Sequence, residues 1–254
     1  MILMRSLMRR RILGGIAAIA IAGGNRPAWS QSTDKGPVLV FGATGKLGAD
    51  IVRSLVAGGN RVTAFTRATS SHDLLKGLDV AYVTGDLFNR ADVVAACKSA
   101  RFRAVIVALR VEDNDLHFYE KAMANIATGA KEGGVKQVIH HSAVGAGENA
   151  KQFANLGWEK VPDLLARMKD QGVGEDLIKA SGAAYTIIRN SRVWPDKTPA
   201  TGKAELTEDQ SVLNPMTRAD LAILTMKCLD NTACFNKTYH VKDTTLTWPP
   251  PKEG

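Results

Sequence analysis

The sequence predicts an α/β fold built on a doubly wound parallel sheet, and three observations support this prediction. Short apolar runs alternate with stretches in which apolar residues recur at helical spacing along most of the chain. The first of these runs leads into three glycines spaced three residues apart, and a helical pattern follows them directly. No linker or internal repeat divides the chain. Strands that alternate with helices connect through right-handed crossovers, which place helices on both faces of one parallel sheet.

The predicted strands are short apolar runs of the kind that a buried parallel strand requires. They cover residues 38–41, 61–66, 80–84, 104–108, 137–142 and 184–189. The predicted helices cover about residues 45–57, 90–100, 116–132, 161–180 and 217–229. In such a sheet the ligand crevice lies outside the carboxyl ends of the strands, so the residues that follow each strand are the candidates for function.

The segment from Gly42 to Gly48, with the sequence Gly-Ala-Thr-Gly-Lys-Leu-Gly, joins the first predicted strand to the first predicted helix. Unpaired backbone N–H groups and the dipole at a helix N-terminus favour negative charge, so this position suits a diphosphate. Gly42 permits a tight turn, Gly45 lets the chain approach the diphosphate, and Gly48 lets the helix pack close to the strand. A structural turn without a ligand is the alternative interpretation, and the flanking strand and helix favour the phosphate site.

The spacing of these glycines resembles that of the atypical and extended short-chain dehydrogenase/reductases, in particular the NmrA-like and NAD(P)H-binding group. Further matches lie at Gly85–Leu87, Ser181–Arg189 and Thr217–Ala222, so the resemblance spans about residues 37–241. It implies an NAD(P)-binding Rossmann fold. The residues expected to bind the dinucleotide in the glycine segment are Gly42, Thr44, Gly45, Lys46, Leu47 and Gly48.

Arg67 follows the second predicted strand, where an NAD-selective enzyme places an acidic residue on the ribose hydroxyls. A guanidinium can form a two-pronged contact with the 2′-phosphate of NADP, so the sequence favours NADP, with NAD as the alternative cofactor. A solvated surface arginine is the other interpretation of Arg67. The resemblance further implies that Asp86 accepts a hydrogen bond from the adenine amine and that Leu87 packs on the ring. Asp86 is also a candidate N-cap for the helix at Arg90.

Ser142, after the fifth predicted strand, matches the family's residue that hydrogen-bonds the substrate carbonyl. Adjacent strand residues point to opposite faces of a sheet, so His140 shares the face of Ser142 if the strand is regular, whereas His141 does not. For both histidines, a core position bonded to a backbone carbonyl is the favoured interpretation.

The next predicted helix lacks the tyrosine of the family's Tyr-x-x-x-Lys pair, in which tyrosine passes a proton and lysine lowers its pKa and holds the ribose. The family's register places Arg167 at the tyrosine position and Gln171 at the lysine position. Lys169 is the nearest amine, and it reaches the ribose only if the helix is shifted. Tyr119 lies too early in the chain to substitute by sequence alone. Ser142 and Lys169 are therefore the catalytic candidates.

Two classes of function are compatible with this pattern. The first is an NADP(H)-dependent oxidoreductase that passes a hydride to a small-molecule acceptor needing little acid catalysis, such as a flavin or a quinone. The second is a dinucleotide-binding protein with a redox-sensing or structural role and no turnover. Sugar-nucleotide epimerase or dehydratase chemistry is a further alternative, which the missing tyrosine and lysine disfavour. Residues of about 190–216 are expected to form the substrate side of the cleft.

Residues 1–30 have the pattern of an export signal, with five arginines, no acidic residue and an apolar run from Ile12 to Ala22. This run is shorter than the roughly 20 residues of a membrane span, so no stable membrane anchor is expected. Cleavage before Gln31 would leave residues 31–254 as one domain in the periplasm or another exported location. Arg9–Leu13 also resembles the twin-arginine pattern, and an ordinary basic signal is the alternative.

The composition limits the classes of partner. The whole chain carries a net charge of +8, but without the leader's five arginines it has 28 basic and 25 acidic residues, or +3. No nucleic-acid partner is therefore expected. Cys97 is expected in the core, and the spacing of Cys228 and Cys234 leaves a disulfide open as a possibility in an oxidising compartment. No Cys/His cluster has metal-ligand spacing, so no metal is expected.

Overall fold

The computed structural model describes residues 35–111 and 115–250, and the predicted leader lies outside this range. The strands are β1 (Val38–Phe41), β2 (Val62–Thr66), β3 (Ala81–Thr84), β4 (Ala104–Val107), β5 (Gln137–Ala143), β6 (Ala184–Asn190), β7 (Glu205–Thr207) and β8 (Lys237–Lys242). The α-helices are α1 (Lys46–Ala57), α2 (Arg90–Lys98), α3 (Phe118–Glu132), α4 (Leu164–Lys179) and α5 (Arg218–Cys228). Short 3₁₀ helices are η1 (Asp73–Leu75), η2 (Gly147–Leu156), η3 (Trp158–Lys160) and η4 (Thr232–Cys234).

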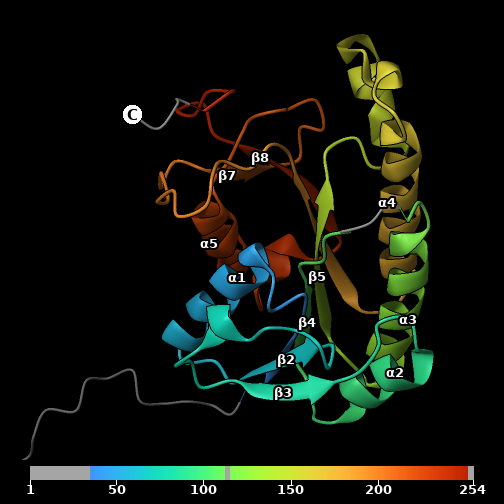
Figure 1. Cartoon of the computed structure of the whole chain (residues 1–254), viewed down its shortest axis with the longest axis vertical. Helices are drawn as coiled ribbons and strands as arrows, with labels where there is room; N and C mark the ends of the chain where they lie inside the picture. Colours follow the sequence, from blue (N-terminus) through green and yellow to red (C-terminus); the bar gives the residue numbers. More distant parts are fainter. Residues whose placement is uncertain (1–34, 112–114, 251–254) are drawn as a thin grey trace, which may run out of the picture. The chain divides into compact units, whose positions relative to one another are not determined.

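These strands form one sheet in the order β3-β2-β1-β4-β5-β6-β8-β7. Neighbouring strands are parallel except for β7, which runs antiparallel to β8. Helices α1 and α5 lie on one side of the sheet, and α2, α3 and α4 lie on the other (Figure 1). The predicted doubly wound parallel sheet is thus confirmed.

All six predicted strands and all five predicted helices are present, with ends that differ by at most three residues. The strands β7 and β8 lie outside the predicted set. β7 has only three residues and none of them is fully buried. β8 carries lysine, threonine and histidine among its apolar residues, so it does not resemble the other buried strands. Pairing with β6 and β7 on its two sides makes this segment a strand.

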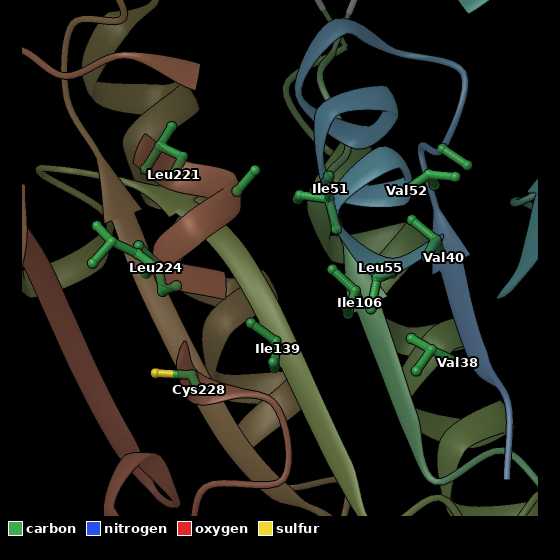
Figure 2. Packing of buried hydrophobic residues seen from close by; sticks show 14 of the residues in the cluster. Val38, Val40, Ile51, Val52, Leu55, Ile106, Ile139, Leu221, Leu224 and Cys228 are labelled. Carbon is green, nitrogen blue, oxygen red and sulfur yellow. The ribbon is translucent and has the colours of Figure 1, made fainter. Parts of the chain in front are cut away.

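Two apolar cores cover the two faces of the sheet. Every residue of β1 is buried, because alternate side chains enter opposite cores. Val38 and Val40 pack with residues of α1 and α5, as Figure 2 shows, whereas Leu39 and Phe41 pack with residues of α2 and α3. The cores hold the strands in register, and the carboxyl ends of the strands therefore form a fixed edge.

A disulfide joins Cys228, at the end of α5, to Cys234 in η4. The sequence left this bridge open, and the structure contains it. Cys97 is buried in α2, as predicted, and burial raises the pKa of its thiol to about 12. Among the described residues, no helix is long and apolar enough to cross a membrane.

Candidate functional site

The order of the strands reverses between β1 and β4, and a doubly wound sheet opens its ligand crevice at this point. Gly42 follows β1, and Ala108 follows β4. The two backbones are in close contact, because a Cβ atom added to Gly42 would lie 2.4 Å from the carbonyl oxygen of Ala108. Gly42 also has a φ of +78°, which side chains disfavour. Only glycine fits at this turn.

Gly45 and Gly48 have different surroundings. A Cβ on Gly48 would lie 2.0 Å from the carbonyl oxygen of Gly42, so this glycine lets α1 pack against the turn. Apart from its chain neighbours, a Cβ on Gly45 would meet one atom of the described residues within 4 Å, the carbonyl oxygen of Gly42 at 3.3 Å. The backbone of Gly45, with φ −76° and ψ 165°, would accept any residue. The space beside Gly45 is therefore open to a ligand.

The N-terminus of α1 begins at this open space. Gly45 is its N-cap and has no side chain with which to cap the helix, and the first turn carries no acidic residue. The first N–H groups of a helix have no intrahelical partner and carry partial positive charge. The uncapped turn and the open approach at Gly45 together fit the diphosphate of a dinucleotide. Thr44 is half-buried in the turn, and Leu47 packs against the core that contains α1.

Lys46 forms an ion pair with Asp196, which belongs to the segment after β6. Asp196 also forms an ion pair with Nη1 of Arg218 at 2.7 Å, and the same nitrogen donates to the carbonyl oxygen of Trp194 at 3.0 Å. The hydrogen bond from Lys46 holds the pKa of Asp196 below its usual range. Through Asp196, these contacts link the predicted substrate-side segment, residues 190–216, to the start of α1 beside the glycine turn.

Arg67 and Asp86 follow the adjacent strands β2 and β3, and both are exposed. Asp86 accepts the backbone N–H of Phe88 at 2.9 Å, in a turn that precedes α2. It is not the N-cap of α2, because the side chain of Asn89 accepts the N–H of Ala91 instead. This corrects one of the two interpretations of Asp86. Leu87 is half-buried and packs against the core that contains α2 and α3.

Ser142 is buried near the end of β5, and its hydroxyl donates to Oε1 of Gln171 on α4 at 3.3 Å. Lys169 is exposed. Residues two positions apart on a helix project about 200° apart around its axis, so Lys169 points away from the side that Gln171 presents to Ser142. The structure does not bring the two predicted catalytic residues together, because α4 is not shifted in the way that Lys169 would require.

His140 lies on the same face of β5 as Ser142, and its ring centroid is 6.4 Å from that of Tyr119. Among the described residues, no hydrogen-bonding group contacts either ring nitrogen of His140. His141 faces α5, where Nε2 lies 2.9 Å from Oγ1 of Thr225. The expected backbone-carbonyl partner is therefore absent for both histidines in the described part of the chain. Burial lowers the pKa of each to about 4, so both are neutral at pH 7.

Sequence reasoning set aside Tyr119, which the structure places at this edge of the sheet. Its hydroxyl donates to the carbonyl oxygen of Leu109, just beyond β4, at 3.3 Å. Its backbone N–H donates to the buried carboxylate of Asp170 on α4 at 2.8 Å. These two residues are 51 positions apart in the chain, so no local spacing reveals the contact. No group of three His, Cys, Asp or Glu side chains suited to a metal occurs among the described residues.

A family model described as NAD(P)H-binding matches residues 42–232. Sterol demethylase protein B of Methylococcus capsulatus is 35% identical over 130 residues, which are 49% of this chain and 40% of that protein. The chain spans about half the length of the curated relatives that it matches.

Solved structures share the fold. ChuY of Escherichia coli O157:H7, described as an anaerobillin reductase, has a TM-score of 0.71 and 23% identity, covering 83% of this chain and 98% of that one. A short-chain dehydrogenase/reductase of Veillonella parvula, solved in complex with NADP, has a TM-score of 0.67 and 15% identity, covering 85% and 98%. At these identities the similarity is one of fold.

Proposed function

The chain belongs to the NAD(P)H-binding family, and from this membership we propose that it is an NADP(H)-dependent reductase acting on a small-molecule acceptor. The observation that carries the proposal is the open space at Gly45 beside the uncapped N-terminus of α1. Protein atoms explain the glycines at positions 42 and 48, whereas a bound diphosphate explains the one at 45.

The remaining dinucleotide contacts follow from the strand ends. Arg67 would pair with the 2′-phosphate, which makes NADP the preferred cofactor and NAD the weaker one. Asp86 and Leu87, one strand further out, would hold the adenine. The NADP complex of the Veillonella parvula protein, which shares the fold, supports the binding of a nicotinamide dinucleotide in general. When bound, the reduced dinucleotide supplies the hydride.

The acceptor is expected to be a planar conjugated molecule, such as a flavin, a quinone or a linear tetrapyrrole. α4 presents neutral Gln171 where the family has lysine, and His140, on the same face of β5 as Ser142, is neutral. Conjugated acceptors spread the charge that hydride addition creates, so they need less acid catalysis than a simple ketone. ChuY, which shares the fold, is described as an anaerobillin reductase, and this supports a reductase activity.

A dinucleotide-binding protein without turnover is the second candidate, and the exposed Lys169 favours it, because the family's tyrosine–lysine pair is missing. The absorbance of NADPH, followed in the presence of flavin, quinone and tetrapyrrole acceptors, distinguishes the two candidate functions. Acceptor-dependent oxidation supports the reductase. Tight NADPH binding with no oxidation by any acceptor would favour the non-catalytic protein.

We also propose that the mature chain works in the periplasm or another exported location. A disulfide between Cys228 and Cys234, both buried, suits an oxidising compartment, and the predicted leader supplies the signal. Fractionation of cells making the full chain tests this. If the chain is exported by the twin-arginine route, the double variant Arg9→Lys, Arg10→Lys should not be exported. A native mass spectrum of the exported chain would show whether it leaves the cytoplasm with its dinucleotide bound.

A further inference from the structure

Three buried polar side chains from separate elements meet at the carboxyl ends of β4 and β5. Ser142 lies on β5, Gln171 on α4 and Tyr119 in the first turn of α3, and each is less than one tenth exposed. The Ser142 hydroxyl donates to Oε1 of Gln171 at 3.3 Å. The hydroxyl of Tyr119 donates to the carbonyl oxygen of Leu109 at 3.3 Å, and the side chain of Gln171 acts to lower the pKa of this phenol. Gln171 is therefore the residue that Ser142 and Tyr119 share.

The hydrogen bond of the Tyr119 hydroxyl ends beside the glycine turn. Leu109 directly follows Ala108, whose carbonyl oxygen is the atom that a Cβ on Gly42 would strike. The Tyr119 hydroxyl is thus hydrogen-bonded to the backbone just beyond the end of β4. β4 lies next to β1, and the order of the strands reverses between these two strands. A hydroxyl in this position lies at the crevice that the proposed cofactor would occupy.

The backbone of Tyr119 is also held from α4. The two carboxylate oxygens of Asp170 accept the N–H groups of Tyr119 and Glu120, at 2.8 and 2.9 Å. Asp170 thus fixes the backbone of Tyr119, and Gln171 is the next residue of the same helix. A fixed backbone is what a group needs if it must meet a reacting atom in a constant geometry.

We propose that Tyr119 donates the proton in the reductase reaction, in place of the tyrosine that α4 lacks, and that Gln171 positions its hydroxyl beside Ser142. The inference rests on the proposed function. The acceptor gains a hydride from the reduced dinucleotide at an electrophilic carbon, and it gains the Tyr119 proton at the atom that receives the displaced electron pair. The dinucleotide is left oxidised, and water returns a proton to the phenolate.

Burial raises the pKa of Tyr119, so the phenol carries its proton at neutral pH. The amide of Gln171 does not titrate, so it orients the hydroxyl and takes no part in the transfer of the proton. Gln171 is therefore a positioning residue.

The first test needs no acceptor. The chain has four tyrosines, so ¹³C at their ring Cζ atoms gives four NMR signals, which Tyr→Phe variants assign. Oxidised NADP should shift the signal of Tyr119 and leave the signal of Tyr239 unchanged. Tyr239 is the matched control, because its hydroxyl also donates to a backbone carbonyl oxygen, that of Ala233, at 3.3 Å. If NADP binds and the Tyr119 signal does not move, the proposal is overturned. Failure of NADP to bind would overturn the proposed function, and this inference with it.

Two variants complete the test. Gln171→Met should shift the Tyr119 signal in the free protein, and an unchanged signal would contradict the positioning role. With an acceptor that the wild type reduces, Tyr119→Phe should lower kcat about 100-fold and leave the NADPH affinity unchanged. Tyr239→Phe, the matched control, should leave kcat unchanged. A Tyr119→Phe enzyme with wild-type kcat would overturn the proposal.

Discussion

The carboxylate of Asp170 on α4 accepts the backbone N–H of Tyr119 at the start of α3, with an oxygen–nitrogen distance of 2.8 Å. His117, the N-cap residue of α3, makes no capping hydrogen bond with its side chain. The N-terminus of α3 is therefore capped by a side chain of the neighbouring helix α4. This contact joins the two helices, because α3 supplies the N–H donor and α4 supplies the carboxylate acceptor.

Loss of this cap should destabilise the protein. We expect Asp170→Ala to lower the free energy of unfolding by about 1–2 kcal/mol, because two buried N–H groups lose their acceptor. Chemical denaturation measures the change. Asp176→Ala on the same helix is the control, since Asp176 is exposed and its carboxylate pairs with Lys179 at the surface. Equal losses in both variants would show that the cap has no special role.

The fold could be predicted from the sequence because its signals are local. The glycine turn at Gly42 lies between an apolar run and a helical pattern, and both keep their place in the structure. The catalytic side could not be predicted in the same way. Lys169 was chosen by its distance along the chain, whereas the side that α4 turns toward Ser142 is set by packing. Tyr119 was set aside because its partners, Asp170 and Gln171, lie about fifty residues away in sequence.

Arg67 gives a prediction on cofactor choice. Arg67→Asp should weaken NADPH binding and favour NADH, changing the ratio of the two affinities about 10-fold or more, because the charge that pairs with the 2′-phosphate is reversed. Fluorescence titration with each cofactor measures the ratio. Arg101→Asp makes the same charge change just before β4, at the opposite end of the sheet, and should leave the ratio unchanged. Equal weakening of both cofactors by Arg67→Asp would contradict the assigned contact.

The two buried histidines predict how stability depends on pH. Burial lowers the pKa of His140 and of His141 from 6.5 to about 4, so the unfolded chain takes up protons first as the pH falls. Stability should be complete above pH 6.5 and should decrease between pH 6.5 and 4, by about 3 kcal/mol for each histidine.

Denaturation at several pH values measures this decrease. His140→Leu should remove about half of it, and His117→Gln should leave it unchanged because the His117 side chain is exposed. A His140→Leu variant with the wild-type pH dependence would contradict the prediction.

The disulfide predicts a response to reducing agents. The bridge closes a short loop between residues six positions apart, for which the chain-entropy model gives about 2 kcal/mol of stabilisation. A reductant should therefore lower the Tm of the wild type and leave that of the double variant Cys228→Ser, Cys234→Ser unchanged. A reductant effect of the same size in both proteins would show that the bridge does not contribute.

The most direct test of the central claim is the affinity of Gly45→Ala for NADPH, measured by titration together with the free energy of unfolding. The added Cβ would meet the carbonyl oxygen of Gly42 at 3.3 Å, a tight contact that a shift of a few tenths of an ångström relieves, so stability should fall by no more than about 1 kcal/mol. NADPH affinity should fall at least about 10-fold, because the methyl group occupies the approach to the diphosphate. Gly48→Ala, whose Cβ would lie 2.0 Å from a backbone oxygen, should instead lose stability. A stably folded Gly45→Ala protein that binds NADPH as tightly as the wild type would contradict the assignment of the dinucleotide site.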